Sequence, residues 1–255
     1  MFRSPYTVGD DHLIAAHRFS IEHNCPLITH LAESRHEVLE SIRLKGLRPV
    51  EHLARLGVLS ENMVAAHVVW AEDHELDLLA HYGVGVVHNP QSNMKLASGV
   101  APLPQMLSRN MGVGIGTDGS ASNNDLSLWE EIDTAAKLHK LFTYDPKVVS
   151  AQEAFELATI RGARALHMDH MIGSLEVGKR ADLVVLQMDP IDQIPLRSIY
   201  SALVYATKAN DVCDLMVDGR VLLRDRQLTT LDEDLIREQG LVLRRQIIER
   251  LQLSV

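Results

Sequence analysis

The chain is poor in cysteine, in long apolar runs and in excess positive charge. Its two cysteines, Cys25 and Cys213, are too few and too far apart to form the disulfide framework of a small secreted domain. No apolar run approaches the roughly 20 residues that a bilayer-spanning helix needs, and the first residues, MFRSPYTVGDD, lack the apolar core of a signal peptide. The 25 Lys and Arg against 34 Asp and Glu give a net charge of −9, which argues against a nucleic-acid-binding surface. We therefore expect a cytoplasmic protein that binds neither nucleic acid nor membrane.

The chain does contain a series of short apolar stretches that end in polar residues. Its 255 residues, 46% hydrophobic, suffice for one large α/β domain, or for one domain with a smaller module. Such runs, apolar on both faces, are typical of strands in a sheet that is covered on both sides. The complete stretches are Pro26–His30, Met63–His67, Gly83–His88 and Met111–Asp118. The series would begin with one more strand, before Ser4–Val8, and we expect that strand to be lost or truncated in this chain.

Segments with helical periodicity separate the apolar runs. They are His12–His23, Ser34–Lys45, Ala71–Tyr82 and Leu126–Leu141. Ser34, with Glu37 three residues later, is typical of a capping box at a helix N-terminus. Strands that alternate with helices through short connections form parallel βαβ units. The pattern therefore predicts an α/β fold that is part of a (β/α)8 barrel, in which residues at the C-terminal ends of the strands build the active site.

The pattern changes after about Leu166. The segments GSLEVGKRADLVVLQMD and DVCDLMVDGRVLLRD have the pattern of turn-bounded strands, with Gly178-Lys179 and Asp218-Gly219 as hairpin-type turns. Leu231–Leu253 has the pattern of a charged amphipathic helix, either solvated or at an interface. We predict three parts: the barrel portion over residues 1–170, a small β-sandwich portion over 171–230 and a C-terminal helix over 231–255.

Three histidines occupy equivalent positions, each at the end of an apolar run. His30, His67 and His88 could all be structural hydrogen-bond partners. The turn that Asn89-Pro90 imposes favours this interpretation for His88 in particular. The presence of Glu33 three residues after His30 instead favours His30 as a metal ligand and Glu33 as a proton shuttle. A carboxylate at that position could carry a proton from an attacking water to a leaving group.

Asp118 is the strongest single candidate. It stands in GVGIGTDGSASNND, where Gly116 and Gly119 would let the backbone approach a ligand closely, although an Asp-Gly turn would also explain it. If Asp118 meets the strand-end histidines and Glu33 at one barrel mouth, the nitrogen and carboxylate ligands suit Zn²⁺ or Fe²⁺ better than Ca²⁺ or Mg²⁺. A catalytic zinc usually has three protein ligands and one open position. These residues alone do not identify the reaction.

Several motifs resemble the amidohydrolase superfamily. They are SPYTV, HLAES, AHVVW, HNPQSNMKLASGVAPL and GTDGSASNNDLSLWEEI, in the family's order and over nearly the whole chain. The chain most resembles the 5-methylthioadenosine/S-adenosylhomocysteine deaminases and their triazine-hydrolase-like relatives. GSLEVGKRADLVVL resembles the small β-sandwich that flanks the barrel in these enzymes. The resemblance implies a (β/α)8 barrel with one divalent metal ion, Zn²⁺ or Fe²⁺, in each full site.

The resemblance also implies a role for each candidate residue. His30 and Asp118 would be metal ligands, and Asp118 could also accept the proton of the attacking water. Glu33 would be the proton shuttle and a substrate contact. His67 would orient or polarise the attacking hydroxide or the substrate, and Ser122 would line the substrate pocket. The implied reaction is hydrolytic deamination of a purine nucleoside thioether, in which hydroxide attacks the amine-bearing ring carbon and ammonia leaves.

The chain departs from the family at its start. The family's His-x-His pair at the end of the first strand occurs nowhere in these 255 residues, and Arg3 stands two residues before PYTV, where a histidine is usual in the family. The chain resembles the C-terminal two-thirds of such an enzyme, beginning at about the fourth barrel strand. We therefore expect the chain alone to be impaired in activity.

Three interpretations remain open on this sequence. The first is a metal-dependent deaminase that acts on a small-molecule substrate. The second is a non-catalytic fragment of the same fold with a structural or assembly role. The third is a related hydrolase that displaces chloride or an amine from a heteroaromatic ring. Because a partial barrel would expose unpaired strand edges beside Ser4–Val8 and at Met111–Asp118, we also expect a homo-oligomer.

Overall fold

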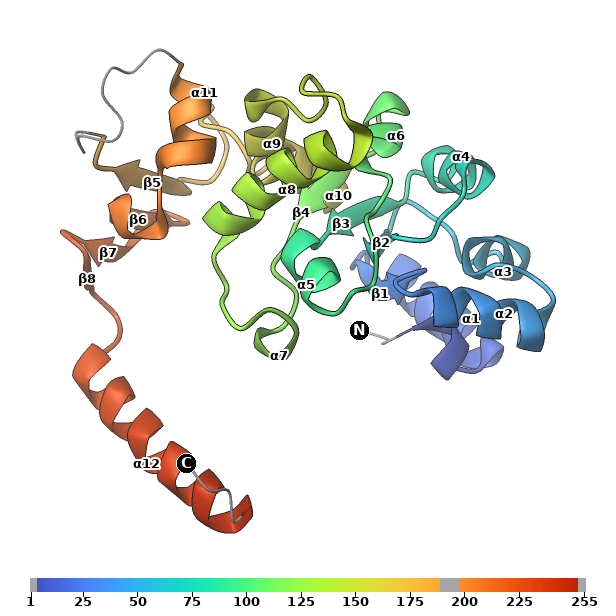
Figure 1. The fold of residues 1–255 in the computed structure, drawn as a ribbon, viewed down its shortest axis with the longest axis horizontal. Helices are drawn as coiled ribbons and strands as arrows, with labels where there is room; N and C mark the ends of the chain where they lie inside the picture. The colour runs from blue at the N-terminus through green and yellow to red at the C-terminus, as the bar shows by residue number, and fades with distance from the viewer. Residues whose placement is uncertain (1–3, 189–197, 252–255) are drawn as a thin grey trace. The chain divides into compact units, whose positions relative to one another are not determined.

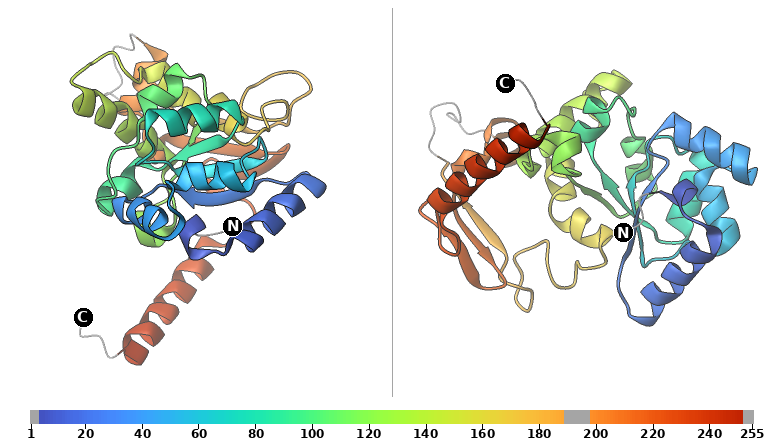
Figure 2. Two further views of the ribbon diagram at one scale, coloured as in Figure 1. Left: turned by 90° about the vertical axis from the view of Figure 1, so that its right-hand side faces the viewer. Right: turned by 90° about the horizontal axis from the view of Figure 1, so that it is seen from below.

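The chain forms two compact units in the structure, a computed structural model that describes residues 4–188 and 198–251 (Figures 1 and 2). Unit 1 comprises Met1–Lys179 and Asp189–Ala209, and unit 2 comprises Arg180–Met188 and Asn210–Val255. Arg3, and the end of the predicted C-terminal helix at Leu253, lie outside the described residues. The three-part division of the chain into residues 1–170, 171–230 and 231–255 stays a prediction.

A parallel four-stranded sheet forms the centre of unit 1. Its strands lie in chain order: β1 (Leu27–Leu31), β2 (Met63–His67), β3 (Gly85–His88) and β4 (Val113–Ile115). Their register places Leu31 opposite His67 and His88 opposite Ile115, so the C-terminal ends of the strands share one edge. All five residues of β2 are buried, as expected for a strand covered on both faces. The parallel arrangement predicted from the sequence is confirmed.

Helices connect the strands and cover the sheet. In unit 1 they are η1 (Pro5–Thr7), α1 (Asp10–Glu22), α2 (Arg35–Lys45), α3 (Pro49–Leu56), α4 (Asp73–His81), α5 (Pro90–Lys95), α6 (Leu103–Ser108), α7 (Ser120–Asn123), α8 (Leu128–Thr143), α9 (Ala151–Leu157), α10 (Ile160–Ala165), α11 (Ile199–Ser201) and the π-helix η3 (Ala202–Ala206). The N-terminal helices α1 to α4 lie on the β1 side of the sheet, and α8 to α10 lie on the β4 side (Figure 1). Helix α10 comes close to the sheet because Gly85 has no side chain: a Cβ there would lie 1.9 Å from the carbonyl oxygen of Ala165.

Ser4–Val8 is not a sheet edge. Pro5 and Thr7 bound the 3-10 helix η1, in which the Thr7 N–H donates to the Ser4 carbonyl at 3.0 Å. Proline at the first position favours such a turn, because its φ is already fixed near the helical value and it has no N–H to satisfy. Within the described residues the sheet is open, with β1 and β4 as its edges. Homo-oligomerisation through these edges stays a prediction.

Unit 2 is built on an antiparallel sheet in the order β5 (Leu183–Leu186), β6 (Val212–Val217), β7 (Arg220–Arg224) and β8 (Gln227–Leu228), with the 3-10 turn η4 (Ala209–Asp211) before β6. Asp218 and Gly219 have φ of 50° and 76°, as a two-residue hairpin turn between β6 and β7 requires, so this predicted turn is confirmed. The predicted hairpin at Gly178-Lys179 is wrong. Its turn leads into β5, which pairs with β6 instead.

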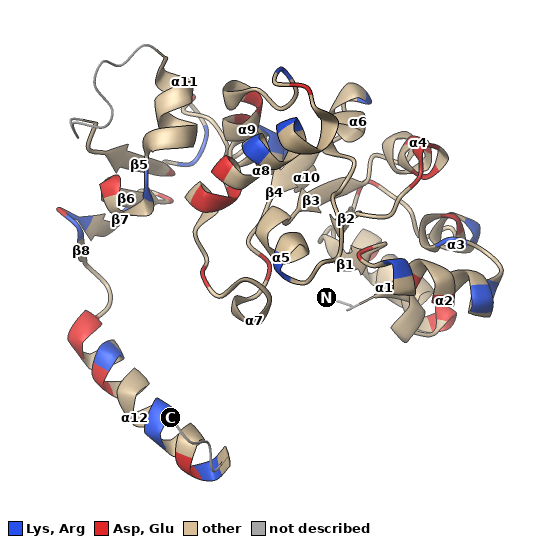
Figure 3. Cartoon of the chain, in the orientation of Figure 1, with Lys and Arg blue, Asp and Glu red and all other residues tan. Residues whose placement is uncertain are grey.

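Helix α12 (Glu233–Leu251) follows the antiparallel sheet. It carries Glu233 and Asp234 in its first turn and Arg250 in its last (Figure 3), a distribution that complements the helix dipole. None of its 19 residues is buried, in agreement with the charged helix expected from the sequence. No helix in the described part of the chain is long and apolar enough to cross a bilayer.

Candidate metal centre

Three candidate residues converge at the C-terminal edge of the parallel sheet. His30 lies in β1, His67 ends β2 and Asp118 follows β4, and one ligand atom from each lies within 4.8 Å of the other two. The imidazole rings of His30 and His67 are stacked, with centroids 5.0 Å apart. Among the residues that the structure describes, no other group of three His, Cys, Asp or Glu side chains has this arrangement. Two imidazoles and one carboxylate are a donor set that suits Zn²⁺.

The backbone turns sharply where these side chains are presented. His67 has φ 73° and Asp118 has φ 60°, and Val68, a β-branched residue, follows with φ 49°. Non-glycine residues rarely adopt this left-handed conformation, and residues held in it are concentrated at functional sites. The strands therefore end in turns that aim polar side chains across the edge of the sheet.

His67 is oriented by a neighbouring amide. Its Nδ1 lies 2.8 Å from Oδ1 of Asn93, so the ring donates from Nδ1 and leaves a lone pair on Nε2. Nε2 of His67 and Nδ1 of His30 are buried and have no hydrogen-bond partner in the structure. Buried polar atoms without partners are costly, and a cation held by the two imidazoles and Asp118 would offset that cost for a nitrogen that ligates it. The residues present therefore fit a metal ion.

Asp118 is held in its charged form. Burial raises its pKa, but hydrogen bonds from Ser92, from the Gly119 N–H and from Ser122 outweigh burial and hold the pKa of Asp118 below its usual value. The Ser92 hydroxyl donates to Oδ2 at 2.7 Å. Ser122, in α7, thus lies against the candidate ligand. Its role in lining a substrate pocket stays a prediction.

Glu33 follows β1, in a segment that Glu37 holds in place. The predicted Ser34 cap is confirmed, since its hydroxyl accepts the Glu37 N–H at 3.2 Å. The Glu37 carboxylate does not complete the capping box: it accepts the N–H groups of Ala32 and Glu33 at 3.0 and 2.9 Å. Glu33 itself accepts a hydrogen bond from Ser98 at 3.4 Å. Its backbone is therefore fixed just after β1. Its role as a proton shuttle and substrate contact stays a prediction.

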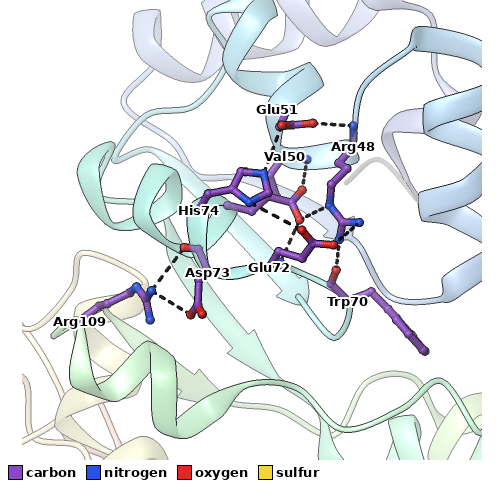
Figure 4. Close-up of polar contacts among 9 residues, drawn as sticks. Arg48, Val50, Glu51, Trp70, Glu72, Asp73, His74 and Arg109 are labelled. Atoms are coloured by element: carbon purple, nitrogen blue, oxygen red, sulfur yellow. Dashed lines mark hydrogen bonds and ion pairs between the residues drawn. The ribbon is translucent and has the colours of Figure 1, made fainter.

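The loop that follows His67 is tied down by Arg48 (Figure 4). The Arg48 guanidinium pairs with Glu75 at 2.7 Å and with Glu72 at 2.9 Å, and it donates to the carbonyl oxygen of Trp70. The Trp70 indole N–H donates to the Ser98 carbonyl at 2.6 Å. Since Ser98 also contacts Glu33, this chain of contacts connects the loop after β2 with the segment after β1.

Replacing Arg48 with methionine is expected to lower the free energy of unfolding by about 3 kcal/mol, because Glu75 would be left fully buried without its cation. Arg109→Met is the matched control, since the partners of Arg109, Asp73 and Asp77, are exposed and such pairs contribute about 1 kcal/mol or less. Urea denaturation of both variants measures the difference. Equal losses of unfolding free energy in the two variants would show that the Arg48–Glu75 pair stabilises the fold no more than the exposed Arg109 pairs do.

His88 lies outside the group of three. It is fully buried, and its Nε2 lies 3.0 Å from Nε2 of His139, on α8. Burial, with smaller contributions from the two neighbouring imidazoles, lowers the pKa of His88 well below its usual value, and burial lowers the pKa of His139 to about 4. The two rings therefore form a neutral pair. His139 was not singled out from the sequence, although Ile132, Ala135 and Ala136 place it on the apolar face of its helix.

Glu131 is a buried carboxylate near this edge of the sheet. Burial raises its pKa to about 7, although hydrogen bonds from Gln91 and Asn123 lower it. In the unfolded chain its pKa returns to about 4.5. Between pH 4.5 and pH 7 the folded state keeps a proton on Glu131 that the unfolded state has released. The stability that comes from the protonated Glu131 is therefore fully present below pH 4.5 and is lost as the pH rises through 7.

Wild type is therefore expected to lose stability relative to Glu131→Gln between pH 5 and pH 8, by at most about 3 kcal/mol. Buried neutral His139 has the opposite pH dependence, and its effect cancels in the difference between the two proteins. Urea denaturation at both pH values measures that difference. A difference independent of pH would contradict the raised pKa of Glu131.

Comparison with known proteins shows the family of the chain. Residues 1–222 match the amidohydrolase family. The chain belongs to the amidohydrolase family. It is 44% identical over 236 residues to a 5-methylthioadenosine/S-adenosylhomocysteine deaminase of Syntrophobacter fumaroxidans, a match that covers 92% of this chain and 54% of the relative. It is 40% identical over 232 residues to a 5'-deoxyadenosine deaminase of Methanobrevibacter smithii, covering 91% of this chain and 53% of that protein. The amidohydrolase resemblance found in the motifs is confirmed.

Solved structures of an adenosine deaminase and of a triazine hydrolase variant share the fold. An adenosine deaminase from Xanthomonas campestris with bound zinc superposes with a TM-score of 0.94 at 36% identity, over 96% of this chain and 56% of that one. A triazine hydrolase variant superposes with a TM-score of 0.88 at 25% identity, over 94% and 53%. The chain thus spans about half the length of the relatives it matches. The α/β fold predicted as part of an amidohydrolase barrel is confirmed.

Proposed function

We propose that this chain is the metal-binding portion of a hydrolytic deaminase whose substrate is a purine nucleoside thioether such as 5-methylthioadenosine. The observation that carries the proposal is the pair of buried imidazole nitrogens, on His30 and His67, that have no partner beside the charged Asp118. The names of the relatives supply the reaction and the substrate class.

A metal ion at this site would supply Lewis acidity and lower the pKa of a water. One imidazole nitrogen each of His30 and His67 and a carboxylate oxygen of Asp118 would hold it. Zn²⁺ is our assignment, supported by the zinc in the related adenosine deaminase structure, with Fe²⁺ as the second choice. His67 is thereby a third candidate ligand, in addition to the polarising role that the resemblance implies.

The remaining residues would move protons and place the substrate. Glu33, fixed by its N–H to Glu37, is suited to take a proton from the attacking water and deliver it to the leaving amine. Ser122, held against Asp118, would contact the substrate, and Asp118 could accept the first proton. We further propose a cytoplasmic homo-oligomer that pairs through the open edges at β1 and β4.

We propose that the chain alone binds metal but turns over slowly. Three candidate ligands are enough to hold a catalytic zinc. The chain nevertheless spans only about half of its relatives, and its sheet ends at β1 within the described residues. A site built by one side of a barrel leaves the substrate without contacts from the other side and leaves the water in open solvent.

Ammonia release in the presence of Zn²⁺ tests the function. The substrates are methylthioadenosine, 5'-deoxyadenosine and a chlorinated triazine, assayed with the chain alone and with the chain joined to a segment that carries His-x-His. We expect slow ammonia release from both nucleosides by the chain and much faster release by the joined protein. Chloride release without ammonia would favour the ring hydrolase, and zinc binding without turnover by either protein would favour the non-catalytic fragment.

A further inference from the structure

Helix α5 supplies partners to two of the three candidate ligands. The Ser92 hydroxyl donates to Oδ2 of Asp118 at 2.7 Å, and Oδ1 of Asn93 accepts from Nδ1 of His67 at 2.8 Å. Both side chains are buried. The helix has only 6 residues, and a helix this short has almost no stability of its own. Its position must therefore come from the groups that hold it.

Glu131, on α8, holds the beginning of α5. Its Oε2 accepts a hydrogen bond at 3.1 Å from the backbone N–H of Gln91, the residue before Ser92. The Gln91 amide adds a hydrogen bond to the Thr134 hydroxyl at 3.0 Å, one turn further along α8. Glu131 is itself fully buried, so water does not compete for these contacts.

The same carboxylate also holds the loop that carries Asp118. Oε1 of Glu131 accepts from Nδ2 of Asn123, and that nitrogen also donates to the carbonyl of Thr117 at 2.9 Å. Thr117 is the residue before Asp118. Helix α5 lies against both α7 and α8 in this part of unit 1 (Figure 1). One carboxylate therefore joins both segments that place the candidate ligands.

We propose that Glu131 is a positioning residue of the candidate metal centre, which it serves by fixing α5 and the Thr117–Asn123 loop at a set distance. The inference rests on the proposed function, because it requires a metal at His30, His67 and Asp118. Glu131 touches none of these three side chains and acts through Ser92, Asn93 and Asn123. Its two oxygens accept from two donors, one on each segment.

Glutamine at position 131 tests this arrangement at nearly constant volume. An amide has one acceptor oxygen, so one of the two donors, Gln91 N–H or Asn123 Nδ2, would face an NH₂ group. Either segment could then shift away from α8. Changes in the groups that orient metal ligands typically reduce metal affinity by about 10- to 100-fold. We expect Glu131→Gln to reduce Zn²⁺ affinity by about 10-fold, near the lower end of this range, because Glu131 acts on the ligands through intermediate residues.

The experiment measures metal binding by the full chain. The variants are Glu131→Gln, Ser92→Ala and the double variant. Glu153→Gln is the control, since the Glu153 carboxylate accepts hydrogen bonds from Ser150 at the start of α9. Zn²⁺ affinity is measured by competition with a chromophoric chelator, and the visible absorption of bound Co²⁺ reports the ligand geometry. We expect a weaker affinity and an altered Co²⁺ spectrum in both single variants. The loss in the double variant should be smaller than the product of the two single losses, because the residues act in series.

The outcomes separate this inference from the proposed function. Unchanged Zn²⁺ affinity and an unchanged Co²⁺ spectrum in Glu131→Gln would overturn the role of Glu131 and leave the metal site standing. A wild-type chain that binds neither ion would overturn the site and this inference together. If Glu131→Gln does not fold, Asn123→Ala removes one of the two contacts and leaves Glu131 in place. Wild-type affinity in that folded variant would likewise overturn the inference.

Discussion

His30→Ala is expected to lower the Zn²⁺ affinity of the chain by more than about 100-fold, beyond the range that changes in ligand-orienting groups produce. The variant leaves only His67 and Asp118, and catalytic zinc sites use three protein ligands. A cation held by two side chains stays mostly solvated and dissociates readily. Equilibrium dialysis measures the affinity directly. Thermal unfolding with and without Zn²⁺ gives a second readout, because a ligand that binds only the folded state raises the melting temperature.

The matched control is His12→Ala, which removes an exposed imidazole at the start of α1. It should retain the Zn²⁺ affinity and the melting-temperature shift of the wild-type chain. If His30→Ala and His12→Ala both keep wild-type affinity, the ion binds elsewhere and the three-residue site is wrong.

Glu33→Gln is expected to reduce ammonia release by about 1,000-fold while Zn²⁺ affinity stays unchanged, because positioned proton transfer typically contributes 10²- to 10⁴-fold to a rate. The amide keeps the size and polarity of the side chain and can neither take up nor release a proton at neutral pH. Glu33 lies outside the group of candidate ligands, so the metal should remain. The assay uses the chain joined to the His-x-His segment, in which turnover is fast enough to measure a large loss.

Glu22→Gln, at the exposed end of α1, is the control and should behave as wild type. A Glu33→Gln protein with full turnover would assign the proton transfer to another group, of which Asp118 is the first candidate. A parallel loss of zinc would instead show that Glu33 holds the metal site together.

Much of the fold was predictable because its signals are local. Runs that are apolar on both faces predicted the four parallel strands to within a few residues, and the Ser34 cap predicted where α2 begins. Asp218-Gly219 predicted a hairpin because both residues must adopt positive φ. The errors have the same origin. The sheet edge expected beside Ser4–Val8 is formed by β1, since Pro5–Thr7 is a 3-10 helix, and the turn at Gly178-Lys179 specified a bend but not the strand that pairs with the next one.

The candidate site was only partly predictable. His30, His67 and Asp118 stand out in the sequence because each ends an apolar run, and the parallel register then brings strand ends together. The sequence left open whether His67 is a metal ligand or a polarising group. That depends on which ring nitrogen is free, and Asn93, 26 positions away, decides it. Glu131 carries no local signal at all, since its contacts lie on two other segments.

The sequence by itself determined the strands, the helices and the residue types at the strand ends, because hydrophobic periodicity, caps and turn residues act over a few positions. Only the tertiary structure decided which atoms of those residues are available to a cation. The Asn93 contact frees Nε2 of His67, the Ser92 hydroxyl keeps Asp118 charged, and burial leaves Nδ1 of His30 without a partner. These properties depend on groups from distant parts of the chain and on exclusion of water, which packing alone establishes.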